Sequence, residues 1–78
     1  MDIKVLGTGC ANCKATIALI DKIAKARGVA VTLDKVEDIG AILAYDVMST
    51  PAVVIDGRVV HAGGVPRPEK IEAWFTQS

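Results

Sequence analysis

The stretch Gly7-Thr8-Gly9-Cys10-Ala11-Asn12-Cys13 is the most informative part of this chain. It contains the two cysteines of the protein, and it follows the apolar run Ile3–Leu6, which is typical of a short strand. A helical pattern begins near Ala11. A Cys-x-x-Cys pair at a strand-to-helix junction indicates a redox dithiol, because the N–H groups and dipole of the helix N-terminus stabilise a thiolate.

The spacing of the two cysteines predicts a different role for each. Cys10, at the mouth of the helix, is the predicted nucleophile, because a lowered pKa there raises its thiolate fraction. Cys13 follows by about one helical turn, so it can close a small disulfide ring with Cys10 and act as the resolving thiol. We expect Gly9, Ala11 and Asn12 to contact the substrate, and the last two to tune the reduction potential.

The rest of the chain alternates helix and strand patterns. The predicted elements are a helix over 11–27, a strand over 29–33, a helix over about 36–45, a hairpin of strands 52–55 and 58–61, and a final helix that begins near Pro66. Asp56-Gly57 between two apolar runs is a strong hairpin signal. Because a helix joins the first two strands, they should be parallel, and the hairpin should add two antiparallel strands. The sequence therefore predicts an α/β fold of order βαβαββα, with a four-stranded mixed sheet flanked by helices, in a single domain over 1–78.

The composition narrows the choice of partners and compartment. The chain has nine basic and nine acidic residues and no net charge, so we expect neither a nucleic-acid nor a membrane partner. Its apolar stretches are too short to span a bilayer. The first residues, 1–4, lack the basic and apolar regions of a signal peptide, and we therefore expect a cytoplasmic protein. In a reducing compartment a lone Cys-x-x-Cys is more often catalytic or metal-binding than structural.

Three segments carry a resemblance to a known family: Gly9–Lys14, Met48–Ala52 and Asp56–Val60. Together they resemble the thioredoxin-like superfamily, and in particular its small thioredoxin/glutaredoxin-like redox-active disulfide proteins. The resemblance implies a cis Pro51 that faces the cysteine pair, so that Thr50 exposes its backbone to an extended substrate. It also implies a thiol-disulfide oxidoreductase without a cofactor. Its substrate would be a disulfide-containing protein or small thiol, and a reductase or low-molecular-weight thiol would supply the electrons.

Two other functions remain open at this stage. The loop 7–13 also resembles that of small heavy-metal-binding domains, in which Cys10 and Cys13 would bind Cu(I) or Zn(II) as thiolates. Such a domain would end on a strand and would have a trans Pro51 remote from the sulfurs. The third possibility is an interaction module with a buried, inert cysteine pair.

Two features outside the cysteine loop carry weaker expectations. His61 lies in a predicted strand far from the cysteines in sequence, so we expect a rim or solvent-facing residue rather than a ligand or base. The apolar run Val59-Val60 can offer an edge to another chain, but nothing in the sequence demands it, and the oligomeric state stays open.

Overall fold

The computed structural model describes residues 1–8 and 11–76 of the chain. In chain order its elements are β1 (Asp2–Leu6), α1 (Ala11–Ala26), β2 (Thr32–Val36), α2 (Ile39–Ala44), β3 (Ala52–Ile55), β4 (Arg58–Ala62) and α3 (Pro68–Thr76). Within these residues the strands form one sheet in the order β2-β1-β3-β4. β1 runs parallel to β2 and antiparallel to β3, and β3 is antiparallel to β4. The predicted α/β fold with a four-stranded mixed sheet is confirmed.

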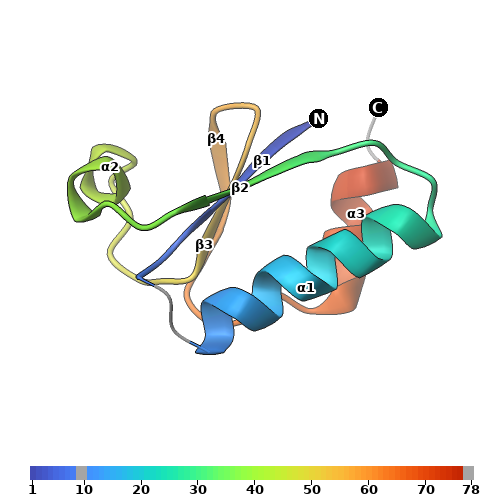
Figure 1. Ribbon diagram of the computed structural model, residues 1–78, viewed down its shortest axis with the longest axis horizontal. Helices are drawn as coiled ribbons and strands as arrows, with labels where there is room; N and C mark the ends of the chain where they lie inside the picture. Colours follow the sequence, from blue (N-terminus) through green and yellow to red (C-terminus); the bar gives the residue numbers. More distant parts are fainter. Residues whose placement is uncertain (9–10, 77–78) are drawn as a thin grey trace.

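The helices form two unequal layers on the sheet. Figure 1 shows α1 and α3 side by side along one part of the molecule, with the small helix α2 apart from them. Two buried clusters match this division, because successive residues of a strand face opposite sides of a sheet. Val53 packs with Ile20 of α1 and Ile71 of α3, whereas Val54 packs with Ile42 of α2. The sheet is therefore covered on both sides.

The predicted position of the second strand, 29–33, was wrong. β2 spans Thr32–Val36, and each of its residues pairs with a residue of β1. The chain uses the intervening residues to leave α1: Gly28 has φ of 67°, and the Val29 N–H still donates to a helix carbonyl at 2.9 Å. Pairing with β1 therefore sets the limits of β2, rather than the β-branched content of the preceding run.

The second helix is shorter than the predicted span of 36–45. Val36 is still paired in β2, so the helix cannot begin there. α2 begins at Ile39, and Asp38 is its N-cap, whose side chain accepts a hydrogen bond from the Gly40 N–H at 3.3 Å. A capping carboxylate satisfies a donor that the first helical turn leaves without a partner.

The β3–β4 hairpin turns tightly at one end and contains an irregularity further along. Asp56 and Gly57 have φ of 49° and 84°, the pair of positive values that a type I′ hairpin turn requires. In the ladder, Val54 pairs with Val59 but Val53 pairs with His61, so that Val60 is an extra residue in β4. His61 is thereby opposite Val53, on the side of the sheet that α1 and α3 cover.

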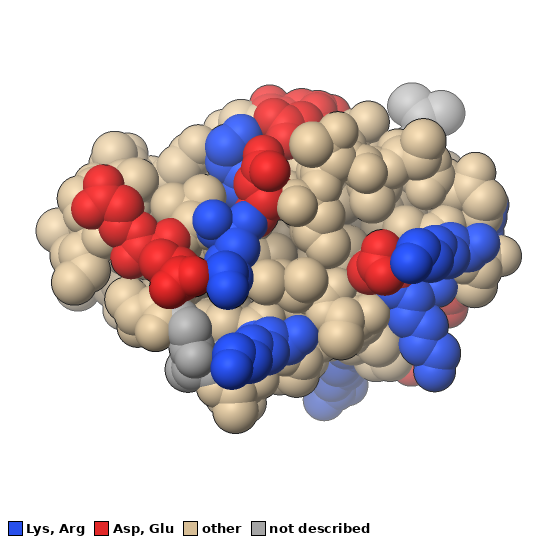
Figure 2. Space-filling view, viewed as in Figure 1, with Lys and Arg blue, Asp and Glu red and all other residues tan. Residues whose placement is uncertain are grey.

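The charged side chains of the surface are mixed in sign. On the face shown in Figure 2, acidic and basic side chains lie interspersed, which agrees with a chain that has no net charge. No helix within the described residues is long and apolar enough to cross a membrane. The face shown in Figure 2 thus has no broad field of one sign that would attract a polyanion.

Candidate functional site

The site begins at the N-terminus of α1, where Cys13 is the third helical residue. Its side chain is 1% exposed, although it lies in the first turn of the helix. Cys10 and Gly9 lie outside the described residues, so their predicted roles stay predictions. The first turn of α1 carries no acidic side chain to oppose a thiolate.

Gly7 forms the surface on which the Cys13 side chain lies. A β-carbon built on Gly7 would collide with Cys13 Sγ and would lie 3.4 Å from Cys13 Cβ. Gly7 is itself buried, and its N–H donates to the Val36 carbonyl at 2.9 Å, which fixes this backbone beyond the end of β1. The glycine is needed here because a side chain would occupy the space of the sulfur. The sequence alone gives no sign of this contact, and only the structure reveals it.

The segment before β3 supplies the other wall of the site. The Thr50–Pro51 peptide bond is cis, Pro51 is buried, and Thr50 is exposed. The same β-carbon built on Gly7 would lie 3.8 Å from Thr50 Cβ, so Gly7 has Cys13 and Thr50 as neighbours. Thr50 and Cys13, 37 positions apart in the sequence, therefore meet around one glycine.

The turn after β4 holds this wall in place. The Gly63 N–H donates to the Pro51 carbonyl at 3.0 Å. Gly63 has φ of 85°, and a β-carbon on it would lie 3.3 Å from Ser49 Cβ, so both its conformation and its neighbour favour glycine. Gly63 was not among the predicted site residues. The paired glycines Gly63-Gly64 were the only local signal for it.

The remaining predicted contacts, Ala11 and Asn12, lie at the exposed start of α1. Asn12 also has an internal function, because its carbonyl accepts a hydrogen bond from Thr16 Oγ1 at 2.7 Å. Among the described residues, Thr16 is the one with a buried polar side chain, and this hydrogen bond satisfies its hydroxyl group. The first turn of α1 thus presents Ala11 and Asn12 to solvent while Cys13 and Thr16 face the interior.

A metal centre finds little support among the residues that the structure describes. They contain no group of three or more histidine, cysteine, aspartate or glutamate side chains that could hold a metal ion. The last described element is the helix α3, whereas a heavy-metal-binding domain would end on a strand. The metal alternative therefore rests on Cys10 and Cys13 alone, and Cys10 lies outside the described residues.

α2 and the segment after it expose apolar side chains. Ile39 and Leu43 are 63% and 65% exposed, and Met48 is 99% exposed. α2 itself, Ile39–Ala44, contains no polar side chain. α2 thus exposes apolar side chains, whereas Asp46 and Ser49, between α2 and Thr50 in the chain, are exposed polar residues.

Comparisons with known proteins agree with this geometry. A family model of the thioredoxin domain matches residues 1–76. A thioredoxin of Methanocaldococcus jannaschii is 33% identical over 70 residues, which cover 90% of this chain and 80% of the relative. A thioredoxin of Methanothermobacter thermautotrophicus is 29% identical over 72 residues, covering 92% and 94% of the two chains. Among solved structures, thioredoxin 1 from the thermophilic eubacterium Thermosipho africanus TCF52B superposes with a TM-score of 0.56 at 21% identity. The match covers 96% of this chain and 94% of that one, and it indicates a shared fold.

Proposed function

Because the chain belongs to the thioredoxin domain family, we propose that it is a thiol-disulfide oxidoreductase whose reactive groups are Cys10 and Cys13. The observation that carries this proposal is the position of Cys13. Its side chain is buried in the first turn of α1, against Gly7, which also has Thr50 as a neighbour. A thiol in that position is shielded from large substrates, and the pitch of a helix would bring a cysteine three residues earlier in the chain within its reach.

The reaction has two exchange steps. The thiolate of Cys10 attacks one sulfur of the substrate disulfide, which forms a mixed disulfide and releases one substrate thiolate. The thiolate of Cys13 then attacks the Cys10 sulfur, forms the Cys10–Cys13 disulfide and releases the second substrate thiolate. Two electrons pass from the protein to the substrate, and an external reductase or low-molecular-weight thiol must return them. Our proposal places this cycle in the cytoplasm.

The proposed substrate groove lies along the segment before β3. Thr50 is exposed next to the Gly7–Cys13 contact, so an extended substrate chain could form backbone hydrogen bonds with it. Gly9, Ala11 and Asn12 would form the opposite rim, at the start of α1. The hydrogen bond from Gly63 to Pro51 would hold the Thr50 wall against the turn after β4.

The test uses two serine variants and a disulfide-bonded protein such as insulin. Cys10→Ser should lose reductase activity, because the remaining thiol, Cys13, is buried and shielded from the substrate disulfide. Cys13→Ser should form the mixed disulfide without resolving it, so a covalent complex should accumulate on non-reducing gels and have the summed mass. A Cys10→Ser variant that reduces insulin at the wild-type rate would refute the proposal.

The reduction potential provides a second, independent check. Equilibration against graded glutathione or dithiothreitol buffers, read out by alkylation and mass, should give a reversible two-electron transition. We expect a midpoint between roughly −180 and −290 mV, the range of thiol oxidoreductases. A pair that never forms a disulfide would contradict the redox function and leave metal binding as the function to test.

A further inference from the structure

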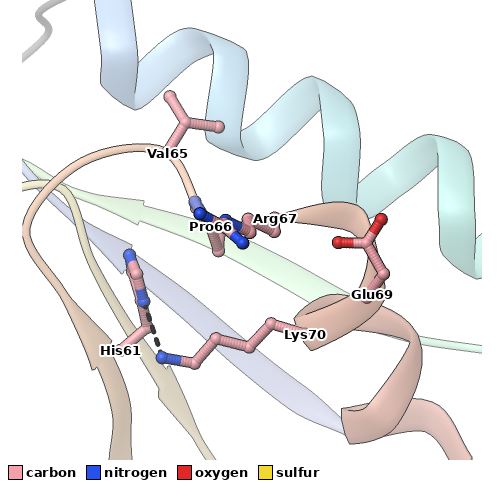
Figure 3. Close-up of a pocket in the computed structure, with 6 residues that line it drawn as sticks. All are labelled: His61, Val65, Pro66, Arg67, Glu69 and Lys70. Atoms are coloured by element: carbon pink, nitrogen blue, oxygen red, sulfur yellow. Dashed lines mark hydrogen bonds between the residues drawn. The ribbon is translucent and has the colours of Figure 1, made fainter.

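A pocket lies at the junction of β4 and α3, and none of the residues of the candidate site lines it. It has a volume of about 620 Å³, and Figure 3 shows its walls. The lining residues are His61, Val65, Pro66, Arg67, Glu69 and Lys70. The extra residue in β4 makes this pocket possible, because it turns His61 toward the helix layer, where α3 passes.

His61 positions the Lys70 ammonium at the edge of this pocket. Lys70 Nζ lies 3.0 Å from His61 Nδ1, and His61 Nε2 lies 2.9 Å from the Gly64 carbonyl oxygen. A lysine ammonium only donates and a carbonyl only accepts, so Nδ1 must accept and Nε2 must carry the hydrogen. The two hydrogen bonds together favour the Nε2–H tautomer of the imidazole, and the dashed line in Figure 3 marks its bond to Lys70.

The charges of the pocket favour an anion. Lys70 and Arg67 are three residues apart, at the start of α3 and immediately before it, and neither forms an ion pair within the described part of the chain. Glu69 is the acidic residue of the lining, and in Figure 3 its carboxylate extends away from the Lys70 ammonium. Two cations against one carboxylate leave the pocket with a net positive charge, and Val65 and Pro66 add apolar walls.

We propose that this pocket binds the oxyanion group of a small molecule, a carboxylate or a phosphate, between Lys70 and Arg67. The Lys70 ammonium donates one N–H to His61 and has two other N–H groups that can donate to a ligand. The Arg67 guanidinium offers a planar pair of donors that suits both kinds of oxyanion. The bond to His61 holds the ammonium in place before the ligand arrives, which lowers the entropic cost of binding.

The oxyanion can have one of two sources. It can belong to a free metabolite, or it can be the acidic group of a disulfide substrate; the second source rests on the proposed function. The geometry allows both, because one short segment connects the pocket to the candidate site. Gly64 accepts the hydrogen bond of His61, and Gly63 donates to Pro51.

The binding test follows the single histidine of the chain by NMR during a titration with inorganic phosphate. The imidazole nitrogens of His61 should first report the Nε2–H tautomer, and their signals should then shift saturably. Lys70→Gln and Arg67→Gln should each weaken phosphate binding by about tenfold or more, the usual effect of losing a charge-assisted hydrogen bond. Arg58→Gln is the matched control, because Arg58 is also exposed but lies at the other end of β4. A wild-type response no larger than that to sodium chloride of equal ionic strength would overturn the proposal, as would equal affinities in all four proteins.

A kinetic comparison separates the two sources. Wild type and Lys70→Gln are assayed with dithiodiglycolate, which carries two carboxylates, and with neutral hydroxyethyl disulfide. A preference for the acidic disulfide that falls in Lys70→Gln supports the pocket as a substrate site. If wild type and Lys70→Gln have the same preference between the two disulfides, and wild type binds phosphate, the pocket is a site for a free anion. If wild type reduces neither disulfide, the proposed function fails, while the phosphate titration still decides the pocket.

Discussion

The side chain of Cys13 lies directly against the backbone of Gly7, so closely that a β-carbon on Gly7 would overlap the sulfur. Gly7 does not have a positive φ, so other residues could adopt its backbone conformation. Glycine is required at this position only because a side chain has no space there. At Gly7, just beyond the end of β1, the backbone lies against both the Cys13 sulfur and Thr50, in the segment before β3. The volume at residue 7 therefore controls where the buried cysteine can lie.

Gly7→Ala should destabilise the protein and reduce its activity together. The added methyl group must displace Cys13 or the end of β1, which is bonded to Val36, and overpacking of this kind costs about 1–3 kcal/mol. Urea denaturation measures the change in unfolding free energy, and insulin reduction measures the rate.

Gly40→Ala is the matched control for that substitution. A β-carbon on Gly40 would meet no atom closer than the Asp38 carboxylate oxygens at 3.7 Å, which is an ordinary contact. Since alanine is the better helix former, this variant should be as stable as wild type or more stable by up to about 1 kcal/mol. Equal destabilisation by both alanines would show that the space around Cys13 is not the cause.

Loss of the α2 cap should destabilise that short helix. Asp38 accepts a hydrogen bond from the Gly40 N–H, and α2 is only six residues long. We expect Asp38→Ala to cost about 1 kcal/mol and Asp38→Asn to cost much less, because asparagine also caps helices. Urea denaturation gives both values, and hydrogen exchange of the Gly40 amide should be faster in Asp38→Ala. Equal stability of the alanine and asparagine variants would argue against a capping role.

Two neighbouring residues of α2 should respond very differently to truncation. Ile42 is 6% exposed and packs in the cluster with Leu6 and Val54, whereas Leu43 is 65% exposed. Ile42→Ala should therefore destabilise the protein by about 2–4 kcal/mol, and Leu43→Ala by about 0.5 kcal/mol or less. Thermal and urea denaturation of the two variants check the difference. Similar losses at both positions would mean that the outer face of α2 is covered in solution.

The ion pair at the start of β1 should give a pH-dependent contribution to stability. The hydrogen bond and charge of Asp2 raise the pKa of Lys4 above its ordinary value, and the two side chains lie 3.0 Å apart. Because the folded-state pKa is raised, this stabilisation is complete below about pH 10, where lysine is charged in both states, and it is lost as the pH rises through the folded-state pKa. Its size should be small, since both side chains reach solvent.

Asp2→Asn should lower the pKa of Lys4, as measured by NMR titration of its side-chain carbon next to the ammonium. Asp21→Asn should leave the pKa of Lys4 unchanged, because Asp21 pairs with Lys25 on α1. The stability difference between wild type and Asp2→Asn should also shrink from pH 7 to pH 11. A difference that grows over that range would contradict the assigned cause.

Local patterns predicted the order of the elements because each pattern has a local physical cause. The Asp56-Gly57 pair marked the hairpin through its backbone preference, and the periodicity of apolar residues marked α1 and α3. The position of β2 could not be obtained in this way. Val29 has the composition of a strand residue, but the strand lies where β1 offers partners, and no pattern within the segment reports the register.

The same distinction applies to the candidate site, where some residues were predicted from the sequence and some contacts depend on how the elements pack. Cys13 was predicted from its motif, and Thr50 and Pro51 from the family resemblance; the structure places Cys13 and Thr50 around Gly7, with Pro51 next to Thr50 in the chain. The contact between Gly7 and Cys13 depends on how a helix docks against the end of a strand, which the sequence does not encode in any local signal. His61 was expected at the rim or facing solvent, and it is half-buried on the side of the sheet that α1 and α3 cover, because an extra residue in β4 decides which way it faces.

That extra residue in β4 also bears on self-association. β2 and β4 are the two edges of the sheet, and edge strands can recruit strands from other chains into aggregates. At Val60 the irregular ladder interrupts the regular spacing of backbone donors and acceptors on one edge, and on the other edge Asp34 and Lys35 are exposed charges. Both edges are thus poor templates for an incoming strand, which protects a small and strongly apolar protein from growing into fibres.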